Sequence, residues 1–244
     1  INGWLFIDKP VGMSSRKVVD LISNSLSIKK VGHAGTLDPM ASGLLPIAIG
    51  EATKTIGVIQ QFKKCYKFVI KWGEKTSTDD KIGTTISSTN VRPSLKDIEK
   101  NLKKFVGKIE QIPPKFSAIK VNGKRAYRLA RKKTNFSLNS RTVFIETLKI
   151  KKQIDNDHCS FECICSKGTY IRALARDLGE AMNCFGHIYE LRRTHVGKFS
   201  DKCSILLDLS EKLIHSSEIL KNILPIEIVL KSLPFINLTK KQEL

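Results

Sequence analysis

The sequence predicts an α+β fold with a largely antiparallel sheet, and two observations carry this prediction. Strand-like and helix-like segments are interspersed along the 244 residues without the regular alternation that βαβ units produce. Residues 141–151 and 159–166 have the pattern of two strands joined by a turn at Asp155-Asn156-Asp157, as in an antiparallel hairpin. The length allows one or two domains, and we find no internal repeat or low-complexity segment.

The N-terminal part of the chain predicts a strand, a turn and a helix. Residues 4–7 are apolar and lead into Asp8-Lys9-Pro10-Val11-Gly12, a turn by composition. Ser14 and Ser15 can cap the helix that follows. The apolar face expected for this helix consists of Val18, Leu21, Ile22 and Leu26.

The middle of the chain predicts a further strand and a second helix. Residues 65–72 have the composition of a strand, and residues 73–83 that of a polar loop. Pro93 and Ser94 then open a helix in which Asp97 lies three residues after the cap. Its apolar positions at helical spacing are Leu95, Ile98, Leu102 and Phe105.

The charge balance favours a polyanionic partner. Lysine and arginine number 42 against 23 acidic residues, and the resulting net charge of +19 raises affinity for nucleic acids of any sequence. A membrane surface would attract the same charge. However, no apolar run approaches the roughly 18 residues that span a bilayer, and the N-terminus lacks the pattern of a signal peptide. We therefore expect an intracellular protein.

The six cysteines are expected to be reduced thiols, because no export signal accompanies them. Their tightest group is Cys159, Cys163 and Cys165 beside His158. These cysteines alternate with polar residues at the period of a half-buried strand, and no C-x-x-C pair is present. The sequence thus favours a strand over a metal site in this segment.

Residues 32–47, GHAGTLDPMASGLLPI, are centred on the carboxylate of Asp38. Gly32 and Gly35 permit backbone angles that other residues avoid, and Pro39 restricts Asp38 to an extended conformation. Such a loop can hold one carboxylate in a fixed position. The residues alone leave two interpretations open, which are a reactive carboxylate and a turn whose aspartate caps the apolar run 44–49.

Residues 113–142 form the most basic segment of the chain. Aromatic residues interrupt its cations, a composition that suits phosphates and bases of a nucleic acid. A solvated, passive basic helix at 125–133 explains the same charges equally well. The cations are Lys115, Lys120, Lys124, Arg125, Arg128, Arg131, Lys132, Lys133 and Arg141, and the aromatic residues are Phe116, Tyr127 and Phe136.

Residues 167–172, KGTYIR, follow the strand predicted at 159–166. Thr169 is expected to cap a helix with an apolar stripe, which leaves Arg172 and Arg176 together on another face. A cation in the first turn opposes the helix dipole, so Arg172 is better explained by a nearby carboxylate. The identity of that carboxylate stays open. The stripe consists of Ile171, Leu174, Ala175 and Leu178.

These motifs resemble those of the TruB family of tRNA pseudouridine synthases, in the family's order from residues 7–12 to Leu191-Arg192-Arg193-Thr194. The resemblance implies the pseudouridine synthase catalytic fold, with a mixed, largely antiparallel sheet flanked by helices and a basic thumb insertion. It also implies isomerisation of uridine to pseudouridine at position 55 in the T loop of tRNA. The implied catalytic residues are Asp38 as nucleophile, Arg172 as its partner and Tyr66 stacked on the flipped-out base.

The same resemblance implies a set of substrate-binding residues. His33 matches the family residue that contacts the target region of the loop, and Leu191 matches the active-site leucine. The thumb, residues 113–142, would close over the tRNA stem-loop. Lys54 and Asp80 fit weaker motifs and are expected only to support the site. The implied substrate-binding set is His33, Lys54, Asp80, Tyr170, Leu191, Lys132 and Lys133.

The resemblance further implies that the reaction needs no cofactor and no metal. The expected partner is the T stem-loop of tRNA, and the expected protein is a monomer that needs no protein partner and no membrane. It would work in a bacterial cytoplasm or, as the second choice, in an organellar matrix. Residues 1–233 are expected to form the catalytic domain, and residues 234–244 a remnant or the start of a C-terminal PUA-like module.

Two alternatives compete with the stand-alone tRNA enzyme. A guide-RNA-dependent enzyme of the dyskerin type would share the aspartate loop but normally has a fuller C-terminal module. A non-catalytic tRNA-folding factor would keep the binding surface without the chemistry. The presence of Asp38, Tyr66 and Arg172 together argues against the folding factor as the main function.

Overall fold

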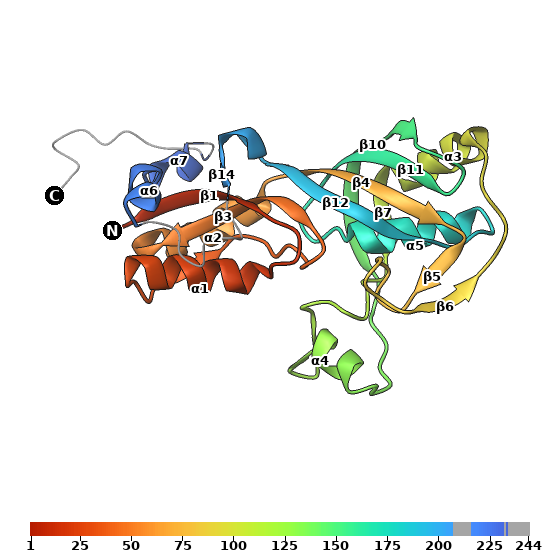
Figure 1. Cartoon of the computed structure of the whole chain (residues 1–244), viewed down its shortest axis with the longest axis horizontal. Coiled ribbons are helices and arrows are strands. Elements are labelled where there is room, and N and C mark those ends of the chain that lie inside the picture. The colour runs from red at the N-terminus through yellow and green to blue at the C-terminus, as the bar shows by residue number, and fades with distance from the viewer. Residues whose placement is uncertain (207–215, 232, 234–244) are drawn as a thin grey trace.

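A ten-stranded mixed sheet runs through the molecule in this computed structural model, which describes residues 1–206, 216–231 and 233 (Figure 1). Along the sheet the order is β14 (Ile205–Leu206), β1 (Gly3–Lys9), β3 (Ser42–Ile49), β12 (Gly186–Val196), β4 (Lys64–Trp72), β11 (His158–Cys165), β10 (Arg141–Gln153) and β7 (Gly107–Gln111). Two further strands, β2 (Val31–His33) and β13 (Phe199–Ser200), pair with β3 and β12.

The pairings β1–β14 and β3–β12 are parallel, and the other pairings of this sheet are antiparallel. The prediction of an α+β fold with a mixed, largely antiparallel sheet flanked by helices is therefore confirmed. The C-terminal remnant expected at 234–244 lies outside the described residues.

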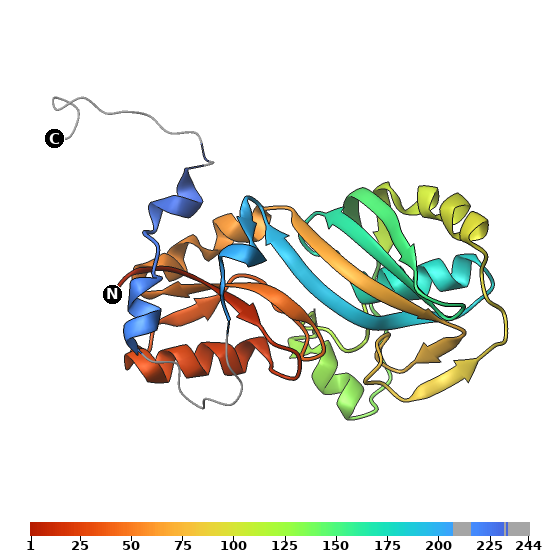
Figure 2. The same cartoon turned by 45° about the horizontal axis from the view of Figure 1, so that its top comes forward.

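Helices lie at both ends of the sheet (Figure 2). At one end lie α1 (Ser15–Leu26), α2 (Ile56–Gln61), α6 (Ser216–Lys221) and α7 (Glu227–Leu230), and at the other α3 (Leu95–Leu102) and α5 (Ile171–Ala181). The long strands β4 and β12 run from the middle of the molecule into the half that carries α3 and α5 (Figure 2). The described residues also form the short 3₁₀ helices η1 (Gly50–Thr55), η2 (Lys103–Phe105) and η3 (Asp201–Cys203).

Two of the three helix caps predicted from the sequence are present. The hydroxyl of Ser14 accepts a hydrogen bond from the backbone N–H of Lys17 at the start of α1. Ser94 and Asp97 form a reciprocal capping box at the start of α3. The buried face of α1 differs from the prediction, because Val19 is buried and Leu21 is only half-buried. Val18 and Ile22 are buried as predicted, so the apolar face is displaced only slightly towards Val19.

The loop predicted at 73–83 is partly wrong. Its first part forms β5 (Glu74–Thr76), which pairs with β6 (Thr85–Ser88) as a small separate sheet. The side chains of β6 are exposed, so the segment lacks the apolar alternation that marks a half-buried strand. The predicted hairpin is confirmed, because the carboxylate of Asp155 accepts from the backbone N–H groups of Asp157 and His158 between β10 and β11.

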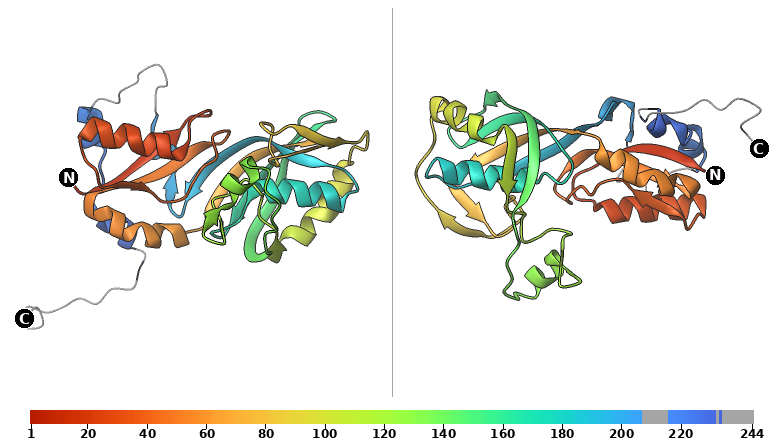
Figure 3. Two further views of the ribbon diagram at one scale, coloured as in Figure 1. Left: turned by 90° about the horizontal axis from the view of Figure 1, so that it is seen from below. Right: turned by 180° about the vertical axis from the view of Figure 1, so that it is seen from behind.

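The basic segment leaves the body of the protein between β7 and β10 and forms a protrusion. It contains the short hairpin of β8 (Lys120–Val121) and β9 (Lys124–Arg125), followed by α4 (Ala126–Arg131). Figure 3 shows α4 standing clear of the sheet in the view from behind. The described part of the chain contains no helix with the length and apolar character needed to cross a bilayer.

Candidate active site around Asp38

The loop between β2 and β3 holds Asp38 through contacts on both sides of it. The Ser15 hydroxyl donates to the carbonyl of Leu37 and accepts from its N–H, each at 2.8 Å. The carbonyl of Pro39 accepts from the N–H of Gly12 at 2.7 Å. The side chains of Leu37 and Met40 are buried in the core, whereas the Asp38 side chain stays 33% exposed. The loop thus presents a carboxylate on a rigid support.

The capping interpretation of Asp38 is wrong. The apolar run 44–49 belongs to β3, and its residues pair with β1, so it is not a helix that an aspartate could cap. Gly35 lies in the left-handed region at φ +110°, which agrees with the need for glycine before Asp38.

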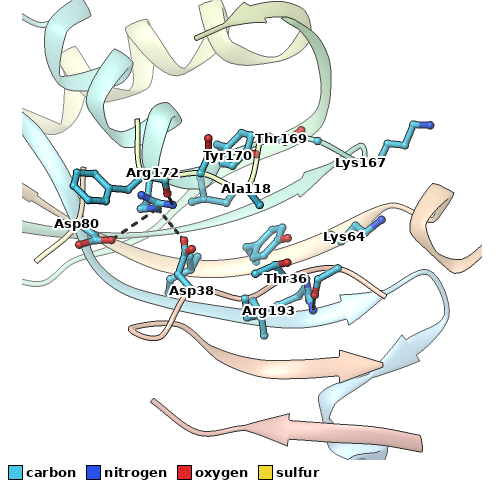
Figure 4. A pocket seen from close by; sticks show the side chains of 18 of the residues that line it. Thr36, Asp38, Lys64, Asp80, Ala118, Lys167, Thr169, Tyr170, Arg172 and Arg193 are labelled. Carbon is cyan, nitrogen blue, oxygen red and sulfur yellow. Dashed lines mark hydrogen bonds and ion pairs between the residues drawn. The ribbon is translucent and has the colours of Figure 1, made fainter. Parts of the chain in front are cut away.

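Arg172 binds Asp38 and three further groups from two other segments of the chain. Its Nε donates to Asp38 Oδ2 at 2.8 Å and lies 3.8 Å from Asp80 Oδ2. Its two terminal nitrogens donate to the carbonyls of Thr78 and Phe116 at 2.8 and 2.9 Å. Figure 4 shows both carboxylates pointing at the guanidinium. Because the Arg172 side chain is almost completely buried, these partners fix its plane.

The start of α5 differs from the prediction, because Thr169 is not its cap. The Thr169 hydroxyl donates back to the carbonyl of Ser166, and the cap position belongs to Tyr170, whose side chain makes no capping bond. Instead, the side-chain amide of Gln111 in β7 accepts from the N–H of Tyr170 and donates to its carbonyl. A side chain from the distant strand β7 therefore satisfies the backbone N–H and carbonyl of the residue just before Arg172.

Asp80 lies in the turn after β5 and is itself held in place. Its Oδ1 accepts from the Thr78 hydroxyl at 2.6 Å and from the N–H of Ile82 at 3.1 Å. The neighbouring Asp79 pairs with Arg176 of α5 at 2.9 Å. Burial raises the pKa of Asp79, and the Arg176 charge opposes that rise. The loop that carries Asp80 is thus tied to the same helix that carries Arg172.

Tyr66 and Leu191 come from neighbouring strands and line the same cavity as Asp38 and Arg172. Leu191 on β12 is 8% exposed, and Tyr66 on β4 is half-buried. Burial raises the pKa of the Tyr66 phenol, while the guanidinium of Arg193, which hydrogen-bonds to Tyr66, acts in the opposite direction. Arg193 and Tyr66 are direct partners in the β12–β4 pairing.

The residues described above enclose a cavity of about 920 Å³. This volume suits a nucleoside, since small-molecule sites have volumes of about 300–1,000 Å³. A second cavity lies on the other side of Asp38, between the start of α1 and the thumb. Six of the predicted site residues line the first cavity, and they are Asp38, Tyr66, Asp80, Tyr170, Arg172 and Leu191.

The remaining predicted residues lie outside the first cavity. His33 and Lys132 line the second cavity. Burial lowers the pKa of His33, and its Nδ1 has no hydrogen-bond partner among the described residues. Lys133 is exposed at φ +52° just after α4. Lys54 lies on η1, is 72% exposed and pairs with Glu51 at 2.6 Å, so the structure does not bring it to the carboxylate site.

Sequence reasoning missed Arg193, which lines the first cavity and is 1% exposed. The sequence contains an indication of this role, because Arg193 lies between the apolar residues Leu191 and Val196 of the segment that forms β12. A charged residue at a buried strand position needs specific partners. Among the described residues no cluster of histidine, cysteine and carboxylate side chains suits a metal, and the cysteines are free thiols.

Two family models together match most of the chain. Residues 23–171 match the TruB family pseudouridylate synthase N-terminal domain, and residues 172–231 match the tRNA pseudouridylate synthase B C-terminal domain. The tRNA pseudouridine synthase B of Caulobacter vibrioides is 44% identical over 239 residues, or 98% of this chain and 77% of the relative. The protein of the same name from Ehrlichia ruminantium is 46% identical over 232 residues, or 95% and 78%.

Among solved structures, the chain resembles one from a Cbf5-Nop10-Gar1 complex. The TM-score is 0.69 at 28% sequence identity, and the match covers 94% of this chain. This chain spans only 61% of the length of that neighbour.

Proposed function

The chain belongs to the TruB family of tRNA pseudouridine synthases, enzymes that isomerise uridine in tRNA, and from this premise we propose that Asp38 is the nucleophile on uridine 55 of the T loop. The observation that supports this proposal best is the Arg172–Asp38 pair. It holds one carboxylate at the wall of a cavity of nucleoside size, with Tyr66 and Leu191 on the same wall.

In this proposal the target uridine leaves the T loop and enters the cavity, where Tyr66 and Leu191 pack against the uracil. Asp38 forms a bond to C1′ as the N1–C1′ bond breaks, the uracil turns, and C5 bonds to C1′ as the bond between C1′ and the Asp38 carboxylate breaks. The C5–H bond then breaks, its electron pair restores the C5=C6 double bond, and the proton leaves to a base. A carboxylate needs no activating base, so the steps at C1′ require no cofactor.

Arg172 has a supporting role in these steps. Its bonds to Thr78 and Phe116 orient the guanidinium, which in turn holds the Asp38 carboxylate towards the cavity. Asp80 Oδ2 lies 3.8 Å from the same Nε and restricts the guanidinium further. Residues 1–233 work as one catalytic unit in this proposal, and the thumb belongs to it.

The tRNA would be held by the surfaces around the cavity. His33, Lys132 and Lys133 face or flank the groove between α1 and the thumb, where the rest of the T loop would lie. Tyr170 contributes an aromatic wall on the α5 side of the cavity. Lys54 would at most contact RNA outside the cavity, because it lines neither hollow.

We further propose that the chain acts as a monomer without guide RNA or protein partners, in a bacterial cytoplasm. The relatives named tRNA pseudouridine synthase B are 44% and 46% identical, whereas the chain from the Cbf5-Nop10-Gar1 complex is 28% identical. The greater likeness supports the stand-alone tRNA enzyme over the guide-RNA-dependent alternative.

The proposal is tested by incubating the purified chain alone with an unmodified tRNA transcript and mapping pseudouridine by sequencing. We expect one modified site, uridine 55, in the absence of guide RNA. A transcript with cytidine at position 55 is the matched control and should stay unmodified. Modification of a different uridine would overturn the T-loop assignment. The absence of any modification would overturn the proposed activity and favour the non-catalytic tRNA-folding factor.

A further inference from the structure

Arg193 is a buried cation that has no carboxylate partner among the described residues. Its side chain is 1% exposed, and none of the ion pairs among the described residues includes it. Its Nε donates to the carbonyl of Leu44 at 2.8 Å, and a terminal nitrogen donates to the carbonyl of Gly35 at 3.0 Å. Burying an unpaired charge is costly, so such a group is a candidate for a role in function.

The two carbonyls that Arg193 binds lie on either side of Asp38 in the sequence. Gly35 precedes the nucleophile by three residues and Leu44 follows it by six, so one guanidinium closes the ends of the loop. The backbones are also in close contact, because a Cβ on Gly43 would lie 2.2 Å from the carbonyl oxygen of Arg193. Arg193 therefore sets the position of the loop relative to β12.

The same guanidinium reaches Tyr66. The two residues are direct partners in the β12–β4 pairing, and their side chains hydrogen-bond to each other. Arg193 thus touches both the loop of the nucleophile and the aromatic residue that faces the base. It is the shared neighbour of the Asp38 backbone loop and the Tyr66 side chain.

The charge of Arg193 affects the groups around it. Burial lowers the pKa of Lys64 to about 8, and the charge of Arg193 adds to this lowering. Burial raises the pKa of the Tyr66 phenol, so its resting form is neutral, and the charge and hydrogen bond of Arg193 oppose that rise. Arg193 therefore lowers the cost of negative charge on the Tyr66 oxygen.

From this arrangement we infer that Arg193 is a positioning residue for the isomerisation, which aligns the Tyr66 hydroxyl with the Asp38 loop and stabilises Tyr66 as the acceptor of the C5 proton. The inference rests on the proposed function. In this step the C5–H bond breaks, its electron pair forms the C5=C6 double bond, and the proton passes to the Tyr66 oxygen as the neutral phenol gives its own proton to water. The Arg193 guanidinium stabilises the negative charge that develops on that oxygen during the transfer.

The test is a single-turnover reaction of the full chain with tRNA transcripts that carry protium or deuterium at uridine C5. Arg193→Lys keeps the charge but cannot bind both carbonyls and the phenol in one plane. We expect the rate to fall about 10-fold or more, as for loss of part of an acid–base contribution, and the isotope effect at C5 to increase. The matched control is Arg192→Lys, because Arg192 binds Asp8 and Asp201 instead, and its isotope effect should equal that of the wild type.

A double-mutant cycle with Tyr66→Phe separates this role from loop support. If Arg193 acts through Tyr66, Arg193→Lys should slow the Tyr66→Phe enzyme by no more than about twofold, because the two losses are not additive. Additive losses with an unchanged isotope effect would show that Arg193 only supports the loop and would overturn the inference.

A second substitution covers the case in which Arg193→Lys does not fold. Citrulline at position 193 keeps the planar shape and the Nε–H donor but removes the charge. A wild-type rate and isotope effect in the citrulline protein would overturn the role of the charge. If the wild-type chain forms no pseudouridine at all, the proposed function fails first, and the inference fails with it.

Discussion

Arg172 Nε lies 2.8 Å from Asp38 Oδ2, although 134 residues separate the two in the chain. The contact depends on three segments that meet at the guanidinium, since its other nitrogens donate to Thr78 and Phe116. Phe116 belongs to the root of the thumb, so the arginine that holds the nucleophile also touches the segment expected to close over RNA. The geometry of the nucleophile therefore depends on parts of the chain that are far apart in sequence.

Replacing Asp38 by asparagine should abolish turnover while leaving tRNA affinity nearly unchanged. Asparagine has the same size but is not a nucleophile at C1′, and binding derives from phosphate and loop contacts. We expect the single-turnover rate to fall by about 10⁴-fold or more, as for loss of other nucleophiles. Filter binding with the same transcript provides the affinity. Activity near the wild-type rate would exclude Asp38 as the nucleophile.

Arg172→Lys should slow the reaction by about 10²-fold, because an ammonium cannot reproduce the planar hold on Asp38 and a misplacement of 1 Å has effects of this size. The matched control is Arg176→Lys, one turn further along α5, where the arginine pairs with Asp79 and Asp177. We expect the control to keep its rate within a few-fold. Equal losses in the two variants would point to a general disturbance of α5.

Local interactions were visible in the sequence. The capping box of Ser94 and Asp97 involves residues three apart, so the sequence alone predicts it. The same holds for the hairpin turn at Asp155, whose carboxylate bonds to the next residues. Asp38 also stood out through its glycine and proline neighbours, but its role came from the family resemblance.

Long-range interactions could not be predicted in this way. Gln111 replaces Thr169 as the group that satisfies the start of α5, from 59 residues away. The clamp of Arg193 on Gly35 and Leu44 requires the parallel pairing of β12 with β3, which no local pattern specifies. Lys54 fits a sequence motif, yet the fold places it away from the cavity.

Gly43→Ala should destabilise the protein by about 3 kcal/mol, because glycine is required for two separate reasons. Gly43 lies at φ +101°, and a Cβ there would lie 2.2 Å from the carbonyl oxygen of Arg193. The control is Gly57→Ala in α2, where a Cβ meets nothing within 4 Å and alanine favours the helix. Urea unfolding measures both variants, and a Gly43→Ala protein as stable as the wild type would contradict the close approach.

The stability of the protein should rise with pH between about 8 and 10.4, in part because of Lys64. Its ammonium donates to the carbonyls of Gln60 and Phe62, and burial lowers its pKa to about 8. The unfolded chain, with a lysine pKa of about 10.4, binds more protons in this window, so the free energy of unfolding increases by up to about 1.4 kcal/mol per pH unit. Lys64→Met should flatten that rise in urea unfolding, and an unchanged slope would contradict the shift.

The thumb lysines should contribute to binding through phosphates and not to the chemistry. Lys132 lines the groove beside Asp38 and Lys133 is exposed next to it, so changing both to alanine should weaken tRNA binding. Each lost phosphate contact should also flatten the plot of log affinity against log salt by about 0.7–0.9. Turnover at saturating tRNA should stay nearly intact, since neither residue lines the nucleoside cavity.

The matched control replaces the exposed Lys96 and Lys103 near α3, across the sheet from the thumb (Figure 1), and removes the same charge. If both pairs change affinity and slope equally, the effect is one of net charge, and the thumb has no special contact with the RNA.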